Sequence, residues 1–248
     1  MKEPKLLRMD DFGACSRVYE KHSSKFFGLL DFYPLYHRRL LGSWGPFREL
    51  SVEEIVEIAT ILGERNVMML FCITAGWPCI NGGIAKFHEV FPEQSKKIKE
   101  YAQLGIFQIA NHGLTHCVLE DPRYRRPGIF GNRDRHREFL PERSNKHLQE
   151  SIELSQQIIS DYFEAEPQIL VPPGHAISSR VFPYLYDSGI EAVASGSSHL
   201  PNIKFRNMQI LNGENFEVFH TRDIVLRGTD FLAEVLKKGE FRRAGHST

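Results

Sequence analysis

Short apolar runs alternate with amphipathic stretches along most of this 248-residue chain, and this alternation is the strongest constraint on its fold. Residues 66–76 and 106–113 are apolar runs that predict buried strands. Residues 51–62 predict a helix, because Ser51 stands at its start and Glu54 follows three positions later, as in a capping box. The alternation is typical of β/α units that build a parallel sheet.

The same pattern predicts the rest of the architecture. Further strands are expected at residues 5–13, 167–175, 190–196 and 216–224, and further helices at 92–105, 147–163, 179–189 and 229–239. Two long stretches break the alternation: residues 14–50 are rich in aromatic side chains, and residues 118–146 are rich in arginine. No repeat or linker divides the chain, so we expect one domain over residues 1–248 with long loops at the carboxyl ends of its strands.

The composition limits the partners and the setting of the protein. Lys and Arg total 31 against 31 Asp and Glu, so the chain lacks the basic excess of a nucleic-acid-binding protein. No apolar run approaches the roughly 18 residues of a membrane-spanning helix, and residues 1–13 lack the apolar stretch of a signal peptide. The four cysteines show no disulfide spacing. We therefore expect a cytoplasmic protein with reduced thiols, and the sequence leaves its oligomeric state open.

Three polar features follow predicted strands, at the edge where parallel α/β folds place their active sites. The first is the pair Asp10 and Asp11. Adjacent carboxylates on a strand point to opposite sides, so one can bind a metal ion while the other acts as a base. The alternative is a solvated acidic turn or a helix cap.

The other two features are histidines. The spacing of His112 and His116 places both imidazoles on one side of a helical turn, close enough to share a cation, although two histidines can also fall at this spacing by chance. His220 ends the apolar run at residues 216–219. A lone histidine is more often an ordinary edge residue than a catalyst, so His220 gains significance only if it lies near the other two features.

Four short segments carry a resemblance to a known family. MDDFG, NHGLTH, LVPPG and VFHTRD occur in the order and approximate spacing of the NodB-like polysaccharide deacetylases, carbohydrate esterase family 4. The likeness extends from residue 9 to about residue 222. It implies an α/β fold, namely a distorted (β/α)7 barrel, and a bound divalent metal ion, usually zinc.

The resemblance gives each matching residue a role. Asp11, His112 and His116 resemble the metal ligands of the family. Asp10 resembles its catalytic base and His220 its catalytic acid. The chemistry agrees, because two imidazoles and one carboxylate leave coordination positions open for water and an amide oxygen. His220 could then protonate the departing nitrogen.

The proline-rich segment both supports and departs from the family pattern. Pro172, Pro173 and Gly174 resemble the wall of the substrate groove, and His175 beside them either contacts substrate or faces solvent. The family normally begins this segment with an arginine that holds the base, whereas this chain has Val171. Candidate replacements are Arg133, Arg135, Arg137 and Arg222. The family's Asp/Trp segment is not recognisable, which leaves the acyl group open.

The leading hypothesis is therefore a metal-dependent deacetylase that hydrolyses an N-acyl amide, acetyl being the first candidate, on an amino sugar or saccharide. One alternative is a non-catalytic carbohydrate-binding barrel that keeps its metal site, suggested by Val171. Another is a hydrolase of a different linear C–N amide such as a formamide. The arginine-rich residues 123–143 form either a solvated face or a site for an anionic substrate such as a sugar phosphate.

Overall fold

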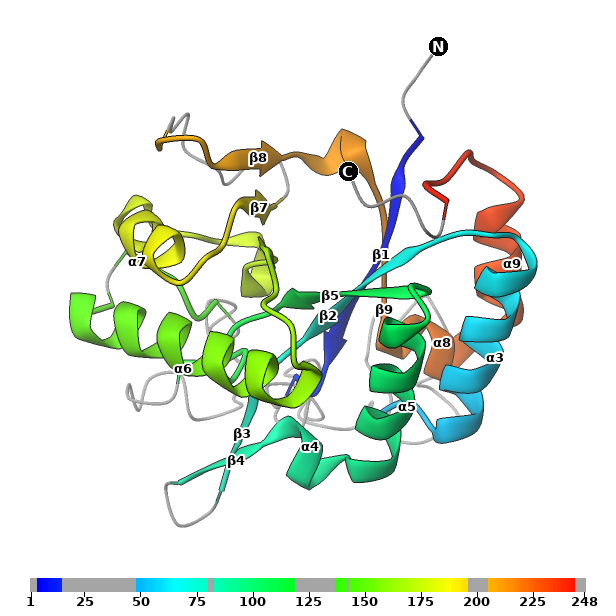
Figure 1. Cartoon of the computed structure of the whole chain (residues 1–248), viewed down its shortest axis with the longest axis horizontal. Coiled ribbons are helices and arrows are strands. Elements are labelled where there is room, and N and C mark those ends of the chain that lie inside the picture. The colour runs from blue at the N-terminus through cyan, green and yellow to red at the C-terminus, as the bar shows by residue number, and fades with distance from the viewer. Residues whose placement is uncertain are drawn as a thin grey trace, which may run out of the picture.

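A curled sheet of seven parallel strands forms the centre of the computed structural model, with helices around it (Figure 1). The structure describes residues 4–14, 48–79, 83–118, 137–141, 143–195 and 205–243. The strands are β1 (Leu6–Phe12), β2 (Met69–Ile73), β5 (Phe107–Asn111), β6 (Ile169–Leu170), β7 (Ala192–Ala194), β8 (Gln209–Leu211) and β9 (Phe216–His220). The helices are α3 (Val52–Glu64), α4 (Phe87–Val90), α5 (Pro92–Gln103), α6 (Asn145–Phe163), α7 (Phe182–Asp187), α8 (Thr221–Arg227) and α9 (Asp230–Leu236).

The strand order is β8-β7-β6-β5-β2-β1-β9, as in a barrel whose neighbouring strands are successive in the chain. Starting at β1, the strands come in sequence order as far as β8, and β9 returns to the other side of β1. Within the described residues, no hydrogen-bonded pairing joins β8 to β9, so this seven-stranded barrel is open on one side. The α/β barrel expected from the sequence is confirmed.

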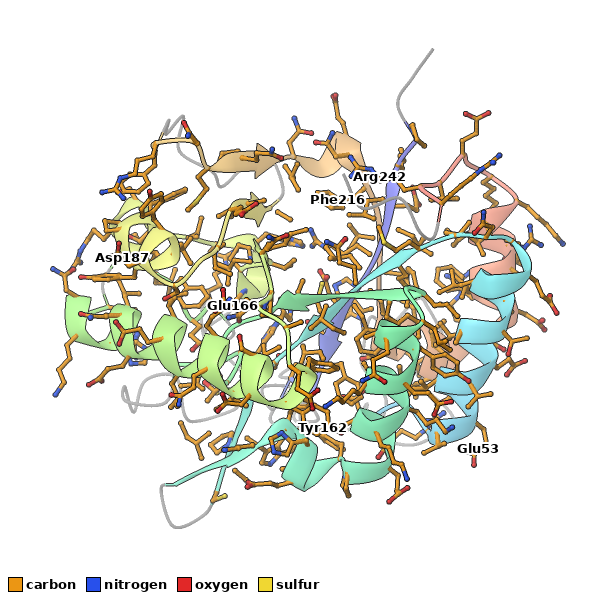
Figure 2. The ribbon with its side chains drawn as sticks, viewed as in Figure 1. Glu53, Tyr162, Glu166, Asp187, Phe216 and Arg242 are labelled. Carbon is orange, nitrogen blue, oxygen red and sulfur yellow. The ribbon has the colours of Figure 1, made fainter. Side chains whose placement is uncertain are left out.

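Helix α3 shows how the local sequence sets an element. The Ser51 side chain accepts the Glu54 N–H at 3.2 Å, and the Glu54 carboxylate accepts the Ser51 N–H at 2.8 Å, which is the predicted capping box. The helix buries one apolar face that includes Ile55 and Leu62. Charged side chains on the outside point away from the sheet, as Glu53 does in Figure 2.

Alternation along β1 divides its side chains between two environments. Leu7 and Met9 pack in the large core beneath the helices, whereas Leu6 belongs to the smaller cluster formed with Leu70 and other residues on the opposite face of the sheet. Because side chains two positions apart share a face of a strand, Arg8 and Asp10 lie on the same side as Leu6. Two charged groups are thus placed on an otherwise apolar face.

The structure differs from the sequence prediction at several boundaries. A hairpin of β3 (Gly76–Pro78) and β4 (Ile84–Lys86), helix α4 and strand β8 were not predicted. The strand expected at 167–175 is only Ile169–Leu170, because the prolines that follow lack the N–H a strand ladder needs. The strand expected at 216–224 stops at His220, where α8 begins. No helix in the described ranges is long and apolar enough to span a membrane.

Candidate active site

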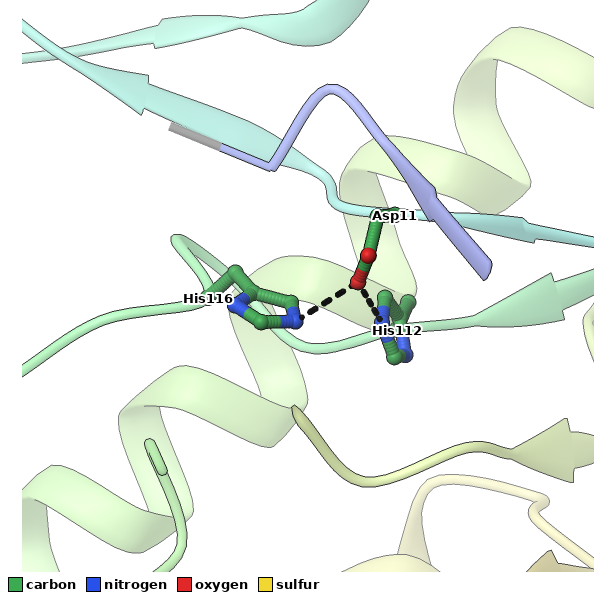
Figure 3. Close-up of side chains that lie close together, drawn as sticks. All are labelled: Asp11, His112 and His116. Atoms are coloured by element: carbon green, nitrogen blue, oxygen red, sulfur yellow. Dashed lines mark hydrogen bonds and ion pairs between the residues drawn. The ribbon is translucent and has the colours of Figure 1, made fainter. Parts of the chain in front are cut away.

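Asp11, His112 and His116 meet at the carboxyl ends of β1 and β5 (Figure 3). The Asp11 Oδ1 atom lies 3.2 Å from His112 Nε2 and 3.0 Å from His116 Nε2. The three potential ligand atoms lie within 4.8 Å of one another, and all three side chains are buried. Two imidazole nitrogens and a carboxylate oxygen facing one point are a donor set that fits a divalent cation such as zinc and leaves coordination positions open.

The orientation of His112 is set by a contact outside this cluster. Its Nδ1 atom lies 2.6 Å from the carbonyl oxygen of Val171 at the end of β6. A ring N–H that donates to a carbonyl fixes the tautomer and leaves the other nitrogen as a ligand atom. Val171 thus orients His112 through its backbone carbonyl, although its side chain cannot hold a carboxylate as an arginine would.

The backbone at Asp11, near the end of β1, and at His116, in the loop after β5, has unusual conformations. Asp11 has φ 76° and His116 has φ 55°, in the left-handed region that non-glycine residues rarely adopt. The register of β1 against β2 shifts between Met9 and Phe12, and such a bulge re-aims a side chain at a strand end. The helical turn expected at residues 112–116 is wrong: these residues follow β5 as an irregular loop.

Asp10 forms a buried ion pair with Arg8. Arg8 Nε donates to Asp10 Oδ1 at 2.8 Å and Arg8 Nη2 donates to Asp10 Oδ2 at 2.6 Å, and the two side chains are 1% and 2% exposed. Burial alone would raise the pKa of Asp10, but the charge of Arg8, followed by that of His112, holds this pKa well below its usual range. Asp10 is therefore an anion near neutral pH.

Arg8 crosses the interior of the barrel. Its Nη1 atom donates to the carbonyl of Ala194 at 3.4 Å, and its guanidinium lies 5.2 Å from the ring centroid of Phe216, which is labelled in Figure 2. Alanines on the same face, Ala110 and Ala194, take up little of this interior. Arg8 thus supplies the guanidinium for Asp10 that the sequence analysis sought in the arginine-rich stretch or at Arg222.

Arg8 was not predicted, because it lies within a strand and not at the end of one. A signal was present: an arginine stands two positions before Asp10 within a strand that is otherwise apolar. The two-residue period of a strand places such a pair on one face, where neither charge can be buried without the other.

His220 lies at the end of β9, beside β1. The strand register places it opposite Asp10, and its Nε2 atom lies 3.9 Å from Asp11 Oδ2. Its Nδ1 atom lies 3.4 Å from Asp223 Oδ2, and the same carboxylate oxygen accepts the His220 backbone N–H at 2.8 Å. Burial opposes ionisation of Asp223, but these hydrogen bonds outweigh it and lower its pKa. Asp223 was not predicted, although it stands three residues after His220.

The segment Pro172–His175 lies next to the ion pair. Pro173 is buried, and Gly174 and His175 have φ 61° and 56°. His175 Nδ1 lies 3.5 Å from Arg8 Nη2, and its carbonyl accepts the Ser195 hydroxyl at 2.9 Å. Burial and the charge of Arg8 lower the pKa of His175 to about 4. This imidazole is therefore neutral near pH 7, and it contacts Arg8 while it stays partly exposed.

The other stretches singled out in the sequence are only partly described. Residues 15–47 and 119–136, which contain most of the aromatic and arginine-rich stretches, lie outside the described residues, as does His199. Arg133 and Arg135 lie there too. The described end of the arginine-rich stretch holds Glu138 and Phe139, which are buried rather than solvated.

Comparison with known proteins gives one family. A family model described as polysaccharide deacetylase matches residues 46–193, more than half of the chain. That range includes His112, His116 and the segment Pro172–His175 but neither Asp10–Asp11 nor His220, which the fold brings to the same place. No curated protein sequence matches the chain.

Several solved structures are similar at low identity. A candidate polysaccharide deacetylase from Mycobacterium smegmatis matches with a TM-score of 0.48 and 12% identity over 99% of this chain and 89% of its own. A family 4 acetyl xylan esterase from Clostridium thermocellum, in complex with a cobalt ion, matches with a TM-score of 0.45 and 14% identity over 79% and 83%. A CE4 family pseudoenzyme from Bacillus anthracis matches with a TM-score of 0.46 and 12% identity over 77% of this chain and 59% of its own.

Proposed function

Because this chain belongs to the polysaccharide deacetylase family, we propose that it hydrolyses the N-acetyl amide of an amino sugar in a saccharide. The observation that carries the proposal is the convergence of Asp10, Asp11, His112, His116 and His220 at one edge of the barrel. These residues come from three strands and supply a metal site, a base and an acid.

Asp10 and the metal ligands are placed to activate the water that attacks the amide. Asp11, His112 and His116 would hold a divalent cation, which would supply Lewis acidity toward that water and the amide carbonyl. Asp10 accepts the proton of that water, and its low pKa means that it is always in the anionic form this needs. Arg8 engages both oxygens of Asp10, so the carboxylate keeps one orientation while it accepts the proton.

His220 supplies the proton that the leaving group needs. An amide nitrogen departs only when it is protonated, and His220 Nε2 faces the site while Nδ1 faces Asp223. Asp223 lies 3.4 Å from Nδ1 and holds the ring in this orientation, as a carboxylate does beside a catalytic histidine. His220 is 26% exposed, so it can exchange protons with solvent between turnovers.

The substrate is proposed at the level of its class. We propose that Pro172, Pro173 and Gly174 form one wall of the substrate groove, next to His175, whose Nδ1 atom lies 3.5 Å from Arg8 Nη2. Residues 196–199, most of the segment ASGSSH that stands where the family's Asp/Trp segment is expected, lie outside the described part of the chain. A formamide or another linear amide is therefore the second candidate, and sugar phosphates stay a prediction from arginines that the structure does not describe. Zinc stays the first candidate metal.

The non-catalytic alternative loses its motive. It rested on the absence of an arginine at position 171, and Arg8 supplies the guanidinium from β1.

The test is an activity assay with defined metal content. Purified protein, stripped of metal and reloaded with Zn²⁺ or Co²⁺, is incubated with N-acetylglucosamine oligomers, N-acetylated sugar nucleotides and N-formyl analogues, and released acetate or formate is measured. We expect metal-dependent acetate release that Asp10→Asn abolishes. Formate release alone would favour the second candidate, and metal-loaded wild-type protein that releases neither acid would contradict both.

A further inference from the structure

The loop that carries His116 presents three backbone N–H groups to one side. Gly113 has φ 81° and His116 has φ 55°, so both depart from helical and extended conformations. Between them, the N–H groups of Leu114, Thr115 and His116 converge on a single point. Successive N–H groups arranged in this way form a concave site that attracts an anion.

That concave site is filled by a side chain of the same protein. Glu138 Oε2 accepts from the N–H groups of Leu114, Thr115 and His116 at 3.0, 3.2 and 3.1 Å, and Glu138 Oε1 lies 3.2 Å from the Leu114 nitrogen. Glu138 is 1% exposed, and it lies 22 residues after His116 in the chain. One oxygen atom thus holds three consecutive backbone groups.

Glu138 is itself anchored in the core. The next residue, Phe139, is fully buried and pairs with Ile177 in a parallel bridge. The Phe139 carbonyl also accepts the Ser178 N–H at 2.9 Å. The carboxylate therefore extends toward the loop from a backbone that is held in the core.

Gly113 allows this close approach. A Cβ atom at position 113 would lie 2.5 Å from Glu138 Oε2 and 2.9 Å from Pro173 Cγ. The loop carbonyls are held from the other side, because Ala75 N–H donates to Gly113 at 3.0 Å and Gly76 N–H donates to Leu114 at 2.6 Å. The loop is fixed on both sides, with Glu138 on the N–H side.

We infer that Glu138 is a positioning residue for the metal site, because its carboxylate holds the 114–116 backbone in the conformation that aims His116 at Asp11. The inference rests on the proposed function only in taking His116 as a metal ligand. Each imidazole then has its own support: the Val171 carbonyl orients the ring of His112, and Glu138 orients the backbone of His116. Such outer partners typically change metal affinity about 10–100-fold.

Two variants separate positioning from charge. Glu138→Gln keeps the length of the side chain and an oxygen for the three N–H groups but loses the charge, whereas Glu138→Asp keeps the charge but withdraws the oxygens by one methylene. Positioning predicts that Glu138→Gln retains metal affinity within roughly threefold and that Glu138→Asp loses about 10–100-fold. Affinity for Co²⁺ is measured by titration of metal-free protein, with Ser51→Ala as the matched control, because it also removes a side-chain acceptor of a backbone N–H but lies at the α3 cap.

A second readout does not depend on metal. Amide hydrogen exchange of metal-free protein reports the N–H groups of residues 114–116 directly, and we expect faster exchange there in Glu138→Asp but not in Ser51→Ala. The reverse order of metal affinity in the two Glu138 variants would overturn the inference, as would unchanged affinity and exchange in both. If wild-type protein binds no metal, the proposed function fails, and normal exchange at 114–116 in Glu138→Asp would then overturn the positioning of the loop as well.

Discussion

β1 and β9 lie side by side in parallel, and each contributes to a pair of titratable side chains. The two pairs lie in different environments. On β1, Arg8 and Asp10 are 1% and 2% exposed and share two hydrogen bonds. At the end of β9, His220 and Asp223 are 26% and 29% exposed and lie 3.4 Å apart. The first pair is closed to solvent and the second is open to it.

This difference matches the two tasks proposed for the pairs. Burial against a permanent cation keeps the proposed base anionic, because Arg8 does not lose its proton and the pKa of Asp10 stays low. An acid that gives up a proton and takes it back must be reached by water. The fold thus separates a fixed charge from an exchangeable one on neighbouring strands.

The largest effect is expected from breaking the buried pair. Arg8→Leu leaves Asp10 as an uncompensated charge and should lower the free energy of unfolding by about 3–5 kcal/mol. Removing both charges in Arg8→Leu/Asp10→Leu should recover much of that loss while activity stays absent. Urea unfolding of wild-type protein and these two variants measures this, and a double variant that is no more stable than Arg8→Leu would contradict the coupling of Arg8 and Asp10.

A smaller effect is expected from pH. The pKa of His175 is lowered to about 4 in the folded protein, so between pH 6.5 and 4 the unfolded chain takes up a proton that the folded protein does not. Stability should therefore fall across this range by at most about 3 kcal/mol, and His175→Gln should flatten the curve. Asp10 acts at lower pH, because its depressed pKa stabilises the fold above about pH 4 and this contribution is lost only below. Thermal unfolding as a function of pH separates the two, and an unchanged slope in His175→Gln would contradict the contribution of His175.

The open pair should respond in activity rather than in stability. Asp223→Asn keeps a side-chain oxygen for the His220 N–H, so the α8 cap survives and stability should change by less than about 0.5 kcal/mol. The variant removes the carboxylate beside the His220 ring. We therefore expect kcat to fall by about tenfold or more, with a changed pH profile. If the free energy of unfolding falls markedly together with kcat, Asp223 is a purely structural residue.

The smallest effect is expected from a surface pair on the same two strands. Lys5 Nζ lies 3.3 Å from Glu217 Oε2, and the two side chains are 45% and 44% exposed. Such pairs contribute about 0–1 kcal/mol, so Glu217→Gln should leave unfolding nearly unchanged. A loss comparable to that of Arg8→Leu would show that burial is not what distinguishes the two ion pairs.

The sequence predicted the elements best where one local rule decides them. The capping box of Ser51 and Glu54 predicted α3, and apolar runs predicted β2 and β5. It failed where tertiary contacts decide: the loop at 112–116 is shaped by Glu138, which lies far along the chain, and no local pattern contains that information.

The candidate site followed the same division. The five residues placed at strand ends meet because parallel strands end at one edge of the sheet. Their supporting partners were missed for two reasons. Arg8 and Asp223 stand close to Asp10 and His220 in sequence, but only the fold shows which neighbour faces them. Glu138 lies 22 residues after His116. Its sequence context does not distinguish it from a surface glutamate, and only the structure shows that it is buried.

The central claim is that the adjacent residues Asp10 and Asp11 have different tasks, and metal titration tests it most directly. Metal-free wild-type protein, Asp10→Asn and Asp11→Asn are titrated with Co²⁺ and followed by visible absorption, with circular dichroism as a check of folding. We expect wild-type protein and Asp10→Asn to bind one equivalent, and Asp11→Asn to lose more than about a hundredfold in affinity, because a ligand contributes at least as much as its outer partners. Loss of binding in Asp10→Asn with normal binding in Asp11→Asn would contradict the account.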